Sequence, residues 1–134
     1  MEAKRNVIII TDGAEKTAEM AAGIASVLSG NDVNIKAASE FQGNDLLPAD
    51  VFFIGCEKPK PDSFAYLTDL LEHINLAGRP CGVFTPGEEE TVKYLTGLVH
   101  DCEAALNPQP LFASSGDTGG VTVTKWAKDV VGQL

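Results

Sequence analysis

The feature that most constrains this sequence is a set of three uninterrupted apolar runs. They lie within residues 5–11, 50–56 and 80–85, and the first contains one valine followed by three isoleucines. A strand that is solvated on one face alternates polar and apolar residues, whereas a strand covered on both faces is apolar throughout. The runs therefore predict a parallel sheet with helices on both sides.

Helical patterns follow these runs. Apolar residues recur at three- and four-residue steps over residues 14–28, 64–74, 92–102 and 123–131. Gly30 and Gly78 are expected to end the first two helices. Asp62 or Ser63 is expected to cap the second, and the glutamates at 88–90 suit the positive first turn of the third.

Two further strands complete the predicted sheet. Residues 32–37 alternate polar and apolar, which is typical of a strand near the sheet edge, and residues 111–113 form a short last strand. The sequence thus predicts one α/β domain over residues 1–134, a three-layer doubly wound five-stranded parallel sheet in the order 2-1-3-4-5. Ligands of such sheets bind beyond the carboxyl ends of the strands. The loops expected there are 11–17, 55–63, 85–90 and 113–120.

Composition excludes several classes of function. Nineteen acidic and ten basic side chains give a net charge of −9, which disfavours nucleic acid and anionic membranes and favours basic protein partners. No apolar run approaches the roughly 20 residues of a membrane span, and the first run is too short for a signal peptide. Three cysteines without a Cys-x-x-Cys spacing predict reduced thiols and no metal site. We therefore expect a cytoplasmic protein.

The loop after the first run carries a family resemblance. Residues 7–10, followed by Thr-Asp-Gly-Ala-Glu-Lys-Thr at 11–17, resemble the first strand and phosphate loop of the flavodoxin-like family. Residues 49–56 resemble the third strand of that family, and residues 78–84 resemble the entry to its fourth. The resemblance implies a flavodoxin-like fold, FMN as the cofactor and electron transfer as the function. It implies a carrier or binding module rather than a catalyst.

The resemblance also implies a set of cofactor-binding residues. In the family, a hydroxyl-x-Thr-Gly-x-Thr loop holds the FMN phosphate with hydroxyls and backbone N–H groups at a helix N-terminus. Around the phosphate it places Thr11, Asp12, Gly13, Ala14, Glu15, Lys16 and Thr17. Beside the flavin ring it places Cys56, Glu57, Lys58, Pro59, Thr85, Pro86 and Gly87.

This chain departs from the family pattern at two positions of the phosphate loop. Thr17 takes the final threonine position and Thr11 offers a hydroxyl at the strand end, but Ala14 and Glu15 stand where the family has threonine and glycine. A carboxylate 4 Å from a phosphate repels it by about 1 kcal/mol even in water, although Lys16 can offset this. Turned outward, Glu15 would do no harm.

The alternative is a module that binds protein and no cofactor. The second and third ligand loops contain no aromatic residue of the kind that stacks on flavin in the family, and the prolines beside Lys58 and Lys60 also suit a rigid surface loop. A phosphorylated receiver domain has the same strand order, but its third strand ends in an aspartate where this chain has Gly55 or Cys56. A degenerate receiver-like interaction or regulatory module therefore stays open.

Several single residues have structural interpretations. Cys56 is expected to be a buried, unreactive thiol, and His73 and His100 are expected to be surface groups on different helices. Trp126 has the helical spacing of a core residue. The glutamates at 88–90, with Asp12 and Glu15, would make the ligand edge acidic, which suits a basic redox partner.

Overall fold

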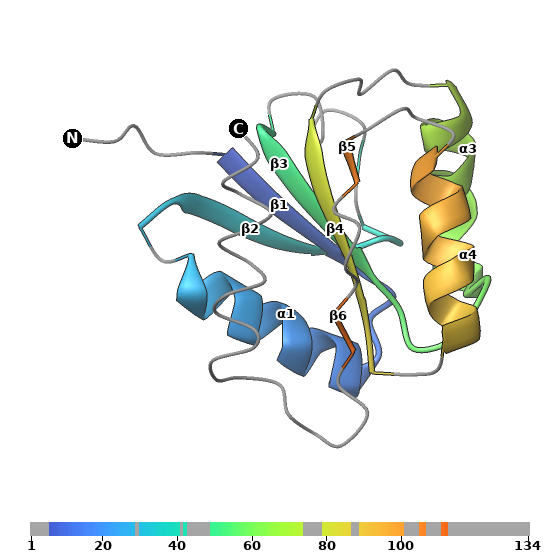
Figure 1. The fold of residues 1–134 in the computed structure, drawn as a ribbon, viewed down its shortest axis with the longest axis horizontal. Helices are drawn as coiled ribbons and strands as arrows, with labels where there is room; N and C mark the ends of the chain where they lie inside the picture. The colour runs from blue at the N-terminus through green and yellow to red at the C-terminus, as the bar shows by residue number, and fades with distance from the viewer. Residues whose placement is uncertain are drawn as a thin grey trace.

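The computed structural model describes most of the sheet and its helices. The described residues are 6–28, 30–40, 42, 49–73, 79–86, 89–100, 105–106 and 111–112. Figure 1 shows a central sheet with helices on both of its faces. The predictions for Gly87, the loop 113–120, the last helix and Trp126 fall outside these residues.

Four long strands form the centre of the sheet, and all of them are parallel. They are β1 (Asn6–Thr11), β2 (Asp32–Ala37), β3 (Val51–Gly55) and β4 (Pro80–Thr85). Their order is β2-β1-β3-β4, as predicted. The burial pattern of β2 also matches the prediction of a less-buried edge strand. In register, Thr11 lies beside Ala37 and Gly55, so the strands end at one common edge.

The prediction of five strands is wrong, because two strands of two residues each pair with β4. They are β5 (Ala105–Leu106), beside Pro80 and Cys81, and β6 (Leu111–Phe112), beside Phe84 and Thr85. Prolines at 108 and 110 separate the two in sequence, and proline has no N–H to donate to a sheet. Leu111 and Phe112 belong to the last strand predicted from the sequence, over residues 111–113, whereas β5 was not predicted.

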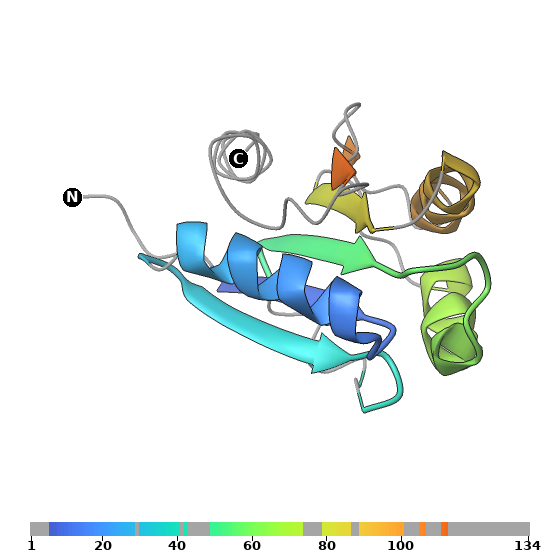
Figure 2. The ribbon, with the colours of Figure 1, turned by 90° about the horizontal axis from the view of Figure 1, so that it is seen from below.

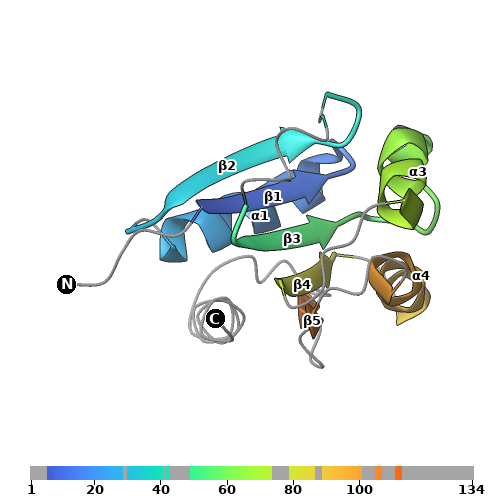
Figure 3. The same ribbon diagram turned by 90° about the horizontal axis from the view of Figure 1, so that it is seen from above.

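Helices cover both faces of the sheet (Figures 2 and 3). α1 (Glu15–Val27) packs on one face, whereas α3 (Ala65–His73) and α4 (Glu89–His100) pack side by side on the other. A single 3₁₀ turn, η1 (Asp62–Phe64), leads into α3. The predicted cap at Asp62 or Ser63 is wrong, because both residues lie inside this turn and Pro61 occupies its N-cap without a side-chain hydrogen bond.

Two hydrophobic layers explain why the apolar runs are continuous. Val7 and Ile9 of β1 pack with α1, whereas Ile8 and Ile10 pack with the α3 and α4 layer. Both faces of β1 are therefore dry, and no position of its interior tolerates a polar side chain without a partner. None of the described helices has the length and apolar character needed to cross a bilayer.

Position 55, the last residue of β3, has room only for glycine. It lies beside Phe84 of β4 in register, and a Cβ atom on Gly55 would overlap the Phe84 ring. Phe84 belongs to the hydrophobic layer under α1. The missing side chain at Gly55 therefore lets β3 and β4 keep their register up to the edge where the loops begin.

Candidate functional site

The candidate site lies at the carboxyl edge of the sheet, where the loops after β1, β3 and β4 leave the strands (Figure 1). The first loop is short and is shaped by its own side chains. Gly13 adopts a φ of 85°, and its N–H donates to Thr11 Oγ1 at 3.2 Å. The N–H of Ala14 donates to Asp12 Oδ1 at 3.0 Å. Thr11 is buried, so its hydroxyl holds the turn and does not face a ligand.

The first turn of α1 follows this loop and offers backbone donors. The N-cap residue, Ala14, makes no side-chain capping bond, and the first intrahelical bond runs from Ala18 N–H to Ala14 O at 2.9 Å. The N–H groups of Glu15, Lys16 and Thr17 have no acceptor among the described residues. Three N–H groups together with the positive end of the helix dipole form a site suited to an anion.

Thr17 adds an unusual polar group to the same turn. The residue is 0% exposed, and its Oγ1 has no hydrogen-bond partner among the described residues. A buried hydroxyl without a partner costs about 1–3 kcal/mol. Such a group calls for a partner that the described residues do not supply, such as a bound ligand, an ion or a water molecule.

The second loop is tied to the first by hydrogen bonds. The N–H of Glu57 donates to Asp12 Oδ2 at 2.8 Å, and Ser63 Oγ donates to Asp12 O at 3.3 Å. Lys60 has a φ of 52°, which gives the loop a sharp bend that non-glycine residues rarely adopt. The first and second loops are thus one connected unit.

Two threonines behind the loop fix its beginning. Thr85, at the end of β4, donates its hydroxyl to Cys56 O at 2.7 Å, and Thr91 of α4 donates to Glu57 O at 3.4 Å. Both threonines are buried. They satisfy the carbonyl groups at the point where β3 stops pairing, which holds the start of the loop in place.

A shallow depression of about 470 Å³ opens over the second loop. Its lining residues are Asp12, Glu57, Lys58, Pro59, Lys60, Pro61 and Asp62. Three of these side chains are acidic and two are basic, and none is aromatic among the described residues. The depression offers charged groups and two proline faces to a ligand.

Cys56 lies under this depression and does not line it. Its side chain is 0% exposed. Burial, with a further contribution from the Asp12 carboxylate, raises the pKa of the Cys56 thiol to about 12. The thiol is therefore protonated at neutral pH, as the sequence analysis expected, and is no nucleophile.

The structure separates ten of the fourteen predicted cofactor residues into three groups. Asp12, Glu57, Lys58 and Pro59 line the depression, and residues 15–17 of the predicted phosphate loop carry the α1 donors that have no acceptor among the described residues. Thr11, Cys56 and Thr85 instead have internal structural roles. Glu15 and Lys16 are exposed, and Gly87 lies outside the described residues.

Sequence reasoning missed the roles of Ser63 and Thr91. Ser63 has the sequence position of a helix cap, and Thr91 lies beside the apolar stripe of α4. No sequence signal pairs a hydroxyl with a carbonyl more than 30 residues away, as the Thr91 bond to Glu57 requires. The family pattern gives one hint about the role of Asp12. When the hydroxyl-x-Thr-Gly-x-Thr pattern is aligned on Thr17, its first hydroxyl position falls on Asp12 and not on Thr11.

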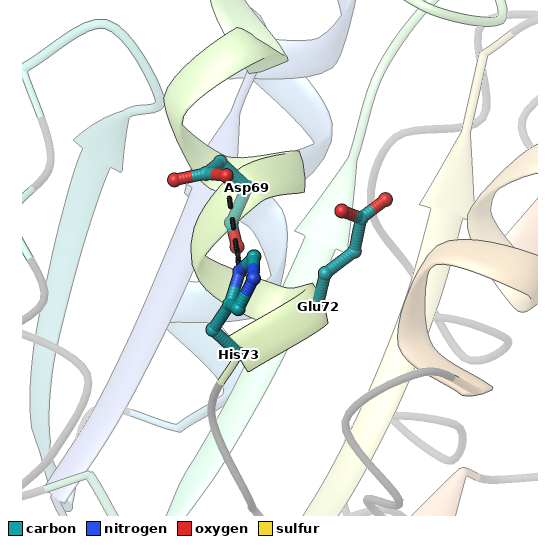
Figure 4. A group of neighbouring side chains, drawn as sticks. All are labelled: Asp69, Glu72 and His73. Atoms are coloured by element: carbon teal, nitrogen blue, oxygen red, sulfur yellow. Dashed lines mark hydrogen bonds and ion pairs between the residues drawn. The ribbon is translucent and has the colours of Figure 1, made fainter.

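A second polar group, on α3, lies away from this edge. Asp69, Glu72 and His73 bring one ligand atom each within 4.8 Å of one another, and all three are exposed (Figure 4). His73 Nδ1 already bonds to Asp69 O at 2.8 Å and lies 3.8 Å from the Asp69 carboxylate. The group is an ordinary exposed i, i+4 arrangement at the end of a helix.

Comparison with known proteins identifies the fold of this chain. No protein-family model matches the sequence, and no curated protein matches it. Among solved structures, flavodoxin 2 from Bacillus cereus is similar with a TM-score of 0.80 at 19% identity, over 96% of this chain and 99% of that one. A flavodoxin from Streptococcus pneumoniae TIGR4 gives a TM-score of 0.78 at 18% identity, over 96% and 99% of the two chains.

A third similar structure contains a cofactor. It is a mutant flavodoxin from Fusobacterium nucleatum bound to flavin mononucleotide, with a TM-score of 0.72 at 10% identity, over 96% of this chain and 94% of that one. The chain therefore has the flavodoxin-like fold. The predicted resemblance is confirmed at the level of fold and strand order.

Proposed function

We propose that this chain binds FMN at the carboxyl edge of its sheet and carries electrons between other proteins. The observation that carries the proposal is the first turn of α1. Three N–H groups and the buried hydroxyl of Thr17 lie together there, and none of them has a hydrogen-bond partner among the described residues. The flavodoxin-like fold adds support, because similar chains include one solved with flavin mononucleotide bound.

The phosphate of FMN would be held by the N–H groups of Glu15, Lys16 and Thr17 and by Thr17 Oγ1. Hydrogen bonds from N–H groups to an ionised phosphate are stronger than those between neutral groups. The exposed ammonium group of Lys16 adds positive charge near the dianion and offsets Glu15. The same donors have no other acceptor among the described residues, so binding would displace only water.

The flavin ring would lie against the second loop. Pro59 and Pro61 offer apolar faces for a planar ring, and Lys58 and Lys60 offer positive charge that favours an anionic reduced flavin. FMN supplies the redox chemistry when bound, since it accepts and releases electrons. The protein residues bind the ring, orient it and set the charge around it.

A basic protein is the expected redox partner. The whole chain has a net charge of −9, and Asp62, Glu89 and Glu90 are exposed near the loops of the site. An acidic face of this kind steers a basic partner electrostatically, and the steering weakens as salt is added.

The test is a titration of the purified protein with FMN and, in parallel, with riboflavin. FMN fluorescence should be quenched saturably with micromolar or tighter affinity. Riboflavin, which lacks the phosphate, should bind at least tenfold more weakly because it leaves the donors of α1 without an acceptor. Equal affinity for the two flavins would contradict the proposed phosphate site.

A second candidate function is a cofactor-free interaction module. The specific observation in its favour is that no aromatic side chain lines the depression over the second loop, among the described residues. If FMN fails to bind even at high micromolar concentration, this alternative is favoured. The fold and the acidic edge would then serve protein binding alone.

A further inference from the structure

Asp12 connects the two ligand loops through both of its carboxylate oxygens. Oδ1 accepts the N–H of Ala14 in the first loop at 3.0 Å, and Oδ2 accepts the N–H of Glu57 in the second at 2.8 Å. The second bond joins residues 45 positions apart in the sequence. One side chain therefore holds together two loops, which are also joined by the bond from Ser63 Oγ to the Asp12 carbonyl at 3.3 Å.

The chemistry of this connection requires a carboxylate. An ionised aspartate has two oxygens that only accept, so it can satisfy two N–H groups that approach from opposite sides. Asparagine has the same shape, but one of its two positions is a donor that would face an N–H group. Bonds to an ionised acceptor are also the stronger ones. No isosteric substitution preserves both bonds.

The N–H groups that Asp12 occupies differ from those free for a ligand. Asp12 takes the N–H groups of Ala14 and Glu57, whereas those of Glu15, Lys16 and Thr17 have no acceptor among the described residues. A phosphate at α1 therefore does not compete with Asp12. The connection between the loops can persist in the empty and the loaded protein.

We propose that Asp12 is a positioning residue that assembles the ligand site before the ligand arrives. By holding Glu57, it holds the second loop, and with it the depression of about 470 Å³ that the loop forms. A loop that is already ordered does not lose conformational freedom on binding, which leaves more of the interaction energy for affinity. The consequence for affinity rests on the proposed binding of FMN.

The experiment compares Asp12→Asn with Asp62→Asn. Asp62 lines the same depression and carries the same charge, but no hydrogen bond joins its side chain to the first loop among the described residues. In the FMN-free protein, amide hydrogen exchange at Glu57 should be at least tenfold faster in Asp12→Asn and unchanged in Asp62→Asn. Exchange at Val83 in the sheet should change little in either variant, which separates a local effect from a global loss of stability.

The affinity for FMN supplies the second readout. Both variants lose one negative charge from the lining of the depression, so the comparison controls for the change in net charge. We expect FMN to bind about tenfold more weakly to Asp12→Asn than to Asp62→Asn. If Asp12→Asn does not fold, Asp12→Ser replaces it, because serine can accept from Ala14 but is too short to reach Glu57.

The outcomes distinguish the two proposals. Unchanged exchange at Glu57 in Asp12→Asn overturns the positioning role, and so does faster exchange with equal FMN affinity in the two variants. If the unmodified protein binds no FMN, the proposed function fails, and the exchange rates alone decide whether Asp12 holds the loop.

Discussion

Thr17 is a residue that folding has buried at a cost. Its hydroxyl has no partner among the described residues, and it lies on the first turn of α1, where a bound ligand would supply that partner. If the hydroxyl lowers stability and contributes to ligand binding, its removal should raise the free energy of unfolding and lower the affinity for the ligand.

Thr17→Val removes the hydroxyl and keeps the shape of the side chain. We expect the free energy of unfolding, measured with urea in the absence of ligand, to rise by about 1 kcal/mol because an unsatisfied buried group is gone. FMN should bind roughly tenfold more weakly, because a hydrogen bond to a charged phosphate is lost.

Thr17→Ser is the matched control, since it keeps the hydroxyl and loses only a methyl group. It should retain most of the FMN affinity and should not be more stable than the parent protein. Lower stability in Thr17→Val would show that the hydroxyl has a partner in the empty protein, and would contradict this interpretation.

Cys56 is expected to be unreactive in the folded protein. With its pKa raised from 9.0 to about 12, the thiolate fraction at pH 8 is roughly 1,000-fold lower than in the unfolded chain. Alkylation with iodoacetamide, followed by mass spectrometry of the Cys56 peptide, should therefore be slow in buffer and fast in urea. Similar rates in both conditions would mean that the thiol is accessible and ionised.

At the scale of strands, Gly55 and Phe84 lie side by side where β3 and β4 end. Gly55→Ala should destabilise the protein by about 1–3 kcal/mol in urea unfolding, because its Cβ overlaps the Phe84 ring. Gly97 of α4 is the matched control, since a Cβ there meets nothing within 4 Å. Gly97→Ala should stabilise the protein by about 0.5–1 kcal/mol through helix propensity.

A double variant tests the cause of that destabilisation. Replacing Phe84 by leucine makes room for a methyl group at position 55, so Gly55→Ala should cost less in the Phe84→Leu background than in the parent protein. If the cost is the same in both backgrounds, the contact with Phe84 is not the reason for the glycine.

In α3, His73 has a raised pKa. The main cause is the hydrogen bond from Nδ1–H to the Asp69 carbonyl, and the carboxylates of Asp69 and Glu72 add to it. Because the folded-state pKa is the higher one, the stabilising contribution is complete below about pH 6.5 and is lost as the pH rises through the folded-state pKa.

An NMR titration of the His73 ring should therefore give a midpoint above about 6.5. Asp69→Asn should lower this midpoint only in part, because the backbone carbonyl remains. Glu72→Gln should lower it less than Asp69→Asn does. A midpoint at or below that of an unfolded peptide would contradict the described geometry.

The helices and strands also show which parts of the fold the sequence pattern could predict. Periodicity and continuous apolar runs predicted β1 to β4 and their order. A strand that is buried on both faces is apolar throughout, and this feature can be read from the sequence. These patterns missed β5 at the β4 edge, because a strand of two residues is too short to show a pattern. They also failed at η1, where Ser63 bonds to Asp12 O instead of capping a helix.

At the scale of the whole molecule, the sheet brings distant loops to one edge. The strand order predicted which loops meet there, because parallel strands in this order place their carboxyl ends together. It could not predict which side chains connect them. The bonds of Asp12 to Glu57 and of Thr91 to Glu57 depend on three-dimensional proximity, and no local pattern records that proximity.

The central claim is that FMN binds with its phosphate at the first turn of α1. The most direct measurement is a titration of the ¹⁵N-labelled protein with FMN, followed by amide chemical shifts. The account predicts saturable shifts that are largest at Glu15, Lys16 and Thr17, and smaller at these positions when riboflavin is used. No saturable shift at high micromolar FMN, or shifts confined to residues away from the carboxyl edge, would contradict it.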